Sequence, residues 1–71
     1  MAVMSEYFDL RGAVITAKLD KAIQVRHKEI GTQWIPESCL HSDSELYVGC
    51  KVGDTGALCV LIWFAEKKGW L

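Results

Sequence analysis

The sequence predicts a mainly β domain, a small and strongly bent antiparallel sheet of four to five strands, barrel-like, with one short helix near the C-terminal end. Extended segments with alternating or β-branched residues recur along the chain and are separated by turn residues. Only residues 63–68 have a helical composition. The 71 residues are therefore expected to form a single domain, residues 1–71, with one core.

The first extended segment covers residues 7–19, with the β-branched residues Val14, Ile15 and Thr16 at its centre. Gly12 interrupts this segment. Because a glycine inside a strand often marks a bulge, we expect a bend there.

A hairpin is expected to follow, from Ala22 to Ile35. Residues 22–27 alternate, so Ile23 and Val25 should point inward while Gln24 and Arg26 point outward. Residues 28–31 form a polar turn whose glycine can adopt a positive φ. Residues 32–35 are extended again until Pro36, which lacks a backbone donor.

A second hairpin is predicted in the C-terminal half. Residues 45–52 alternate apolar and polar side chains and should form a strand. The turn residues 53–56 then lead into residues 57–62, which are apolar on both sides, as expected for a covered strand.

A short helix is expected at residues 63–68, with Gly69 at its C′ position and Trp70 packing back on the last turn. Large side chains at inward positions should form the core. The expected core residues are Ile23, Val25, Trp34, Val48, Leu61 and Phe64.

No catalytic or metal site is expected. Cys39, Cys50 and Cys59 are odd in number and fit neither a disulfide framework nor a zinc knuckle, so they are interpreted as reduced, cytoplasmic thiols. Cys39 with His41 or His27 lacks the third orienting group that a thiolate nucleophile needs. We therefore expect a protein that is not an enzyme and needs no cofactor. No apolar run is long enough to cross a membrane.

Charge is distributed on two sides although the net charge is only -1. The connection 37–44 and the start of the next segment are acidic, which predicts a protein-binding surface. Its candidate partner-binding residues are Glu37, His41, Asp43, Glu45 and Tyr47. The first hairpin is basic, which leaves nucleic-acid binding as an alternative. The residues of that alternative are Lys18, Lys21, Arg26 and Lys28.

The order of motifs resembles a family of short proteins encoded by bacteriophages and mobile elements. The matching segments are Lys21-Ala22-Ile23-Gln24-Val25, Trp34-Ile35-Pro36-Glu37-Ser38, Asp43-Ser44-Glu45-Leu46-Tyr47 and Trp63-Phe64-Ala65-Glu66-Lys67-Lys68-Gly69. The chain departs from the family pattern at Ile62, where a proline is expected before the helix.

What the resemblance implies is a small phage protein that binds and inhibits a host defence protein without catalysis. The partner would be a host protein such as a CRISPR-Cas component, as for anti-CRISPR inhibitors, in the cytoplasm of a bacterial host cell. Two alternatives remain open: a nucleic-acid-binding accessory domain using residues 18–28, and a homo-oligomeric structural module, for example a homodimer, that hides surplus aromatic side chains.

Overall fold

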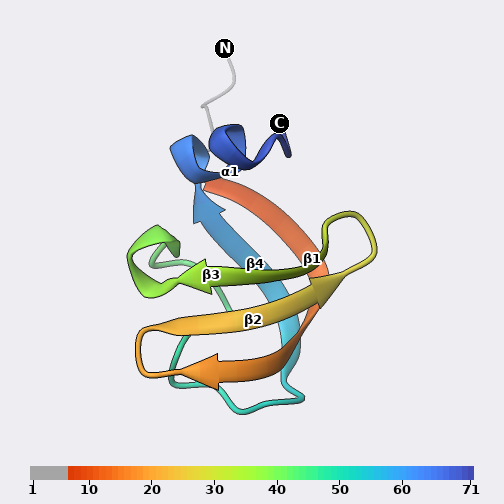
Figure 1. Cartoon of the computed structure of the whole chain (residues 1–71), viewed down its shortest axis with the longest axis vertical. Helices are drawn as coiled ribbons and strands as arrows, with labels where there is room; N and C mark the ends of the chain where they lie inside the picture. The colour runs from red at the N-terminus through yellow and green to blue at the C-terminus, as the bar shows by residue number, and fades with distance from the viewer. Residues whose placement is uncertain (1–6) are drawn as a thin grey trace.

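A computed structural model describes residues 7–71, and it shows a mainly β protein with one short helix (Figure 1). A single antiparallel sheet has four strands in the order β3-β2-β1-β4. The elements in chain order are β1 Tyr7–Leu19, β2 Ala22–His27, β3 Gly31–Pro36, the 3₁₀ turn η1 Glu37–Cys39, β4 Thr55–Leu61 and α1 Ile62–Lys68. The sheet is bent but not closed, because β3 and β4 are its two edges.

The long strand β1 joins the two halves of the sheet (Figure 1). Its N-terminal part pairs with β4 and its C-terminal part pairs with β2. Gly12 has a φ of 82°, and the β1–β4 register shifts between Leu10 and Ala13. The expected bend at Gly12 is thus confirmed, and the positive φ explains why a glycine occupies it.

The predicted first hairpin is also confirmed. β2 and β3 pair with Ile23 opposite Ile35 and His27 opposite Gly31. Gly31 has a φ of 71°, as expected for the last residue of this turn. Ile23 and Val25 are fully buried, whereas Arg26 is exposed, so the predicted alternation of β2 is correct.

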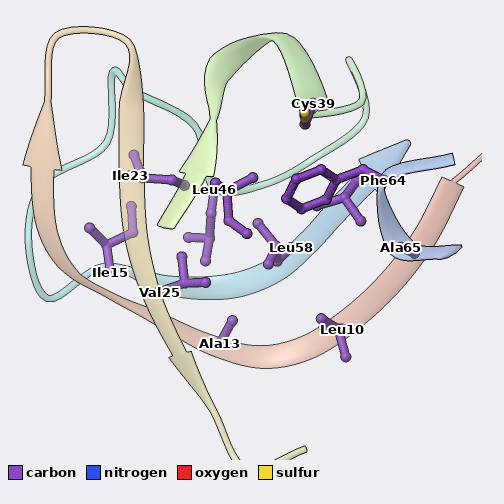
Figure 2. Packing of buried hydrophobic residues seen from close by; sticks show 12 residues of the cluster. Leu10, Ala13, Ile15, Ile23, Val25, Cys39, Leu46, Leu58, Phe64 and Ala65 are labelled. Carbon is purple, nitrogen blue, oxygen red and sulfur yellow. The ribbon is translucent and has the colours of Figure 1, made fainter. Parts of the chain in front are cut away.

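The core lies inside the bend of the sheet, where side chains of β1, β2 and β4 meet those of α1 and of the segment after η1 (Figure 2). Of the expected core residues, Ile23, Val25 and Phe64 are buried. Val48 and Leu61 are only half-buried. The core also contains residues that were not predicted: Leu10, Ala13, Ile15, Ile35, Cys39, Leu46, Leu58, Val60 and Ala65.

The prediction that Trp34 is buried is wrong. Trp34 is 40% exposed, while the next residue, Ile35, is 0% exposed. Successive side chains of a strand point to opposite faces, and Ile35 lies opposite the inward-pointing Ile23. Trp34 therefore lies on the outer face of the sheet, opposite Gln24.

The predicted strand 45–52, and with it the second hairpin, is wrong as well. Residues 41–54 form turns and bends, and β4 pairs with β1 instead. Leu46 is buried, and Val48 and Cys50 pack against the core. Their alternation thus reflects side-chain burial without strand pairing, and turns such as the one from Lys51 to Asp54 interrupt the backbone.

The helix forms close to where it was expected, with Ile62 as its first residue in place of the anticipated proline. Gly69 adopts the left-handed conformation, and the Trp70 amide donates to the Ala65 carbonyl at 2.9 Å. This is a Schellman-type end. The Trp70 ring packs edge-on against Phe64, 5.7 Å between centroids, as predicted for a residue after the C-cap.

Candidate partner-binding surfaces

The acidic connection is a structured segment that covers the outer edge of β4. The His41 amide donates to the Cys59 carbonyl, and the Glu45 amide donates to the Ala57 carbonyl, each at 2.9 Å. In return, the Ala57 amide donates to Glu45 Oε1 at 2.8 Å, and the Cys59 amide donates to Ser44 Oγ at 3.0 Å. Side-chain oxygens thus replace part of the ladder that another strand would supply.

Two of the predicted partner-binding residues, Glu45 and His41, therefore have structural roles. Glu45 uses a carboxylate oxygen to hold β4. His41 accepts the Asp43 amide through Nδ1 at 3.0 Å, and its ring lies 4.6 Å from the Tyr7 ring. Changing either residue would disturb the fold of the connection as well as its surface.

The other predicted residues of this surface are exposed. The Asp43 side chain is 67% exposed, and its Oδ2 lies 3.9 Å from His41 Nδ1. Tyr47 is 54% exposed. Glu37 starts η1, and its amide donates to the Lys21 carbonyl, which places it beside the β1–β2 turn. Glu37, Asp43 and Tyr47 are therefore accessible to solvent.

The predicted basic residues do not share one surface. Lys18 donates from Nζ to the Cys50 carbonyl and so is held against the connection after η1. Lys21 and Lys28 flank opposite ends of β2, and Arg26 lies on the outer face of the sheet. Arg26 and Lys28 together line a shallow hollow at one end of that face.

Trp34, which the sequence predicted in the core, lies exposed on the outer face of the sheet. Cross-strand pairing arranges this face in rows. One row joins Thr55, Val14, Arg26 and Thr32; the next joins Ala17, Gln24 and Trp34; the last joins Leu19, Ala22 and Pro36. These three rows are mainly apolar and contain no acidic residue. The acidic Asp9 lies in a different row, opposite Cys59. The signal that could have found it is the alternation of β2, which fixes the orientation of β3 once the two strands are paired.

His27 is a buried structural residue. Its Nδ1 accepts the Glu29 amide at 3.0 Å, so the ring hydrogen is on Nε2, which donates to the Arg11 carbonyl at 2.8 Å. The ring thereby joins the β2–β3 turn to the bend of β1. Both nitrogens are bonded to backbone groups, so His27 is not placed to act as a base.

The cysteines are free thiols, and Cys39 and Cys59 are buried. Burial, together with the nearby Asp9 carboxylate, raises the pKa of the Cys59 thiol to about 11. Such a thiol is a poor nucleophile at neutral pH. Within residues 7–71, no group of three or more His, Cys, Asp or Glu residues is arranged to hold a metal ion.

Across the described part of the chain, no helix is long and apolar enough to cross a membrane. Comparison of the sequence and structure with protein-family models, curated proteins and solved structures found no match. The fold and surfaces therefore define the protein only by class, as a mainly β domain with a covered sheet edge, an open sheet edge and an exposed acidic connection.

Proposed function

We propose that this protein is a non-catalytic binding domain whose partner is another protein. The observation that supports this best is how firmly the segment 37–54, which begins with the acidic connection 37–44, is held. Backbone and side-chain bonds fix it on β4, so Asp43 and Tyr47 are displayed from a rigid support. A binding segment ordered before association loses less conformational entropy on binding.

The resemblance to short phage-encoded proteins suggests which partner this is. We propose a host defence protein in the bacterial cytoplasm, inhibited in the manner of an anti-CRISPR protein, with a CRISPR-Cas component as one example. The exposed carboxylates of Glu37 and Asp43 would favour a basic surface on that partner.

A pull-down from bacterial lysate with tagged protein tests this proposal. The informative variant is the double reversal Glu37→Lys and Asp43→Lys. The matched control is the double reversal Glu29→Lys and Glu66→Lys, at two exposed residues outside the acidic connection. Glu45 is left unchanged because its side chain bonds the Ala57 amide. The double variant should lose the captured partner, most clearly at low salt, while the control retains it. Equal capture by both variants would refute the acidic surface.

Nucleic-acid binding is a second candidate, favoured by the exposed Trp34 on the same sheet face as Arg26. Single-stranded nucleic acids bind to surfaces that combine stacking aromatics with cations. A mobility shift with an oligothymidylate that weakens with salt, and that Trp34→Thr removes, would support this candidate. The dispersal of Lys18, Lys21 and Lys28 over different parts of the molecule argues against a continuous basic track.

A further inference from the structure

The two edges of the sheet differ in whether another segment of the chain covers them. The outer edge of β4 is covered by the segment after η1, through the bonds of His41, Ser44 and Glu45 described above and through a bridge between Leu40 and Val60. β3 lies at the other end of the strand order, with β2 on one side only. An uncovered edge is a template for pairing with another chain.

The pairing pattern shows which backbone groups β3 presents. In an antiparallel ladder, hydrogen-bonded pairs alternate with pairs that are not bonded to each other. The Glu37 amide donates to the Lys21 carbonyl at 2.7 Å, which makes this a bonded pair and fixes the alternation along β3. The amides and carbonyls of Thr32 and Trp34 therefore point away from β2, to the free edge.

The side chains of β3 do little to prevent such pairing. Gly31–Pro36 contains no charged residue, although charged residues are the usual protection of an edge strand. Pro36 lacks an amide hydrogen, so it limits pairing at the C-terminal end. Trp34 provides a large apolar surface beside the exposed backbone groups.

We propose that β3 binds an extended segment of a partner protein by antiparallel strand addition, with Trp34 and Thr32 as the pairing residues. This proposal rests on the proposed function, that the partner is a protein, and it adds a second contact with that partner, on β3, to the acidic connection. Main-chain pairing provides affinity, and alternate side chains provide selectivity.

The register gives the chemistry of the segment. The incoming residue opposite Trp34 lies on the outer face and packs against the indole, so it is apolar. Two positions further along the incoming chain, the residue opposite Thr32 lies at the end of the row that contains Arg26, near Lys28. Because this end of the face has cations and no acidic residue in its rows, that second residue is acidic. From its N- to its C-terminus, the bound segment therefore has an apolar residue, then any residue, then an acidic residue.

A phage-displayed library of random linear heptapeptides, selected on the intact protein, tests the proposal. The parent should enrich peptides with the apolar, any, acidic pattern. Trp34→Thr keeps the outward amide but removes the indole, and Trp34→Pro removes both. Capture of the enriched peptides should fall with Thr and fall at least tenfold further with Pro. Arg26→Glu should change the selected acidic residue to a basic one.

Two controls separate pairing from unfolding. Trp34→Pro should retain the far-UV circular dichroism of the parent, because the lost amide faces outward, whereas Gln33→Pro removes a bond to β2 and should unfold the hairpin. A synthetic copy of an enriched peptide, N-methylated at its apolar residue, should lose binding. The copy methylated at the middle residue, whose amide points away from β3, should retain it.

Several results would overturn the proposal. Failure to enrich the pattern would do so, as would capture that is unchanged in Trp34→Pro. If capture of the enriched peptides depends on Glu37 and Asp43 and not on Trp34, the proposed function stands and strand addition is wrong. A chain that elutes at twice its mass until Trp34→Pro makes it a monomer would show that a second copy occupies β3. Displacement of the peptides by oligothymidylate would favour the nucleic-acid candidate.

Discussion

Replacing Ile35 by Ala should destabilise the protein much more than replacing its neighbour Trp34 by Thr, although Trp34 is the larger side chain. Ile35 is 0% exposed and lies opposite Ile23 in the core. Truncating a buried isoleucine to alanine costs about 2–5 kcal/mol. At roughly 0.05–0.15 kcal/mol per residue, a domain of 71 residues has a stability of about 4–11 kcal/mol, so Ile35→Ala removes a large part of it.

Trp34→Thr should cost about 1 kcal/mol, because the indole is already 40% exposed and threonine favours strands. Urea unfolding followed by far-UV circular dichroism measures both values, and it avoids the change of fluorescence that loss of a tryptophan causes. A larger loss for Trp34→Thr than for Ile35→Ala would refute the assignment of Trp34 to the outer face.

Three further predictions concern the bend, the covered edge and the thiols. Gly12→Ala should cost about 1 kcal/mol or more in urea unfolding through its positive φ alone, since no atom outside residues 11–13 lies within 4 Å of the added methyl group. An unchanged stability would contradict a bend that requires glycine. Glu45→Ala should lower the free energy of unfolding by about 1–2 kcal/mol, because the Ala57 amide loses its carboxylate partner. Asp43→Ala should change it by no more than about 0.5 kcal/mol. Equal losses in the two variants would show that the Ala57–Glu45 hydrogen bond contributes little. Iodoacetamide at pH 8 should alkylate the half-buried Cys50 before the buried Cys59, as measured by peptide mass spectrometry; early labelling of Cys59 would contradict its burial. The free energy of unfolding should decline as the pH rises from 9 to 11, because the raised pKa means that the folded state holds the Cys59 proton more tightly than the unfolded state does.

The hairpin 22–35 and the terminal helix could be predicted because their signals are local. Alternation along β2 separates Ile23 and Val25 from Arg26 without any knowledge of distant residues. Gly31 and Gly69 mark places where the backbone needs a positive φ. These features depend on neighbours in the sequence, and the structure confirms them.

The orientation of Trp34 is not local in that sense. A tryptophan next to an isoleucine leaves open which of the two faces the core, because both are apolar. The choice depends on the register between β2 and β3, which places Ile35 opposite Ile23. Side-chain size predicted Trp34 as the core residue, whereas the strand pairing places Ile35 there.

The segment 45–52 could not be predicted for a different reason. Its alternating pattern fits a strand, and Leu46 does face the core. However, β4 finds its partner in β1, at the other end of the sequence, and the segment is left to cover the outer edge of β4 with Glu45 and Ser44. The competing pairing with β1 cannot be detected from the pattern of residues 45–52 alone.

The division of β1 between two partners has a consequence for the order in which the molecule can assemble. The pairs that join β1 to β2, such as Leu19 with Ala22, are close in sequence, and β3 follows immediately. The pairs that join β1 to β4, such as Tyr7 with Leu61, span most of the chain. Closing short loops costs less entropy and is faster than closing long ones, so the three-stranded meander should form first. On a ribosome, the N-terminal half of β1 would wait unpaired until the last strand has been synthesised and has emerged.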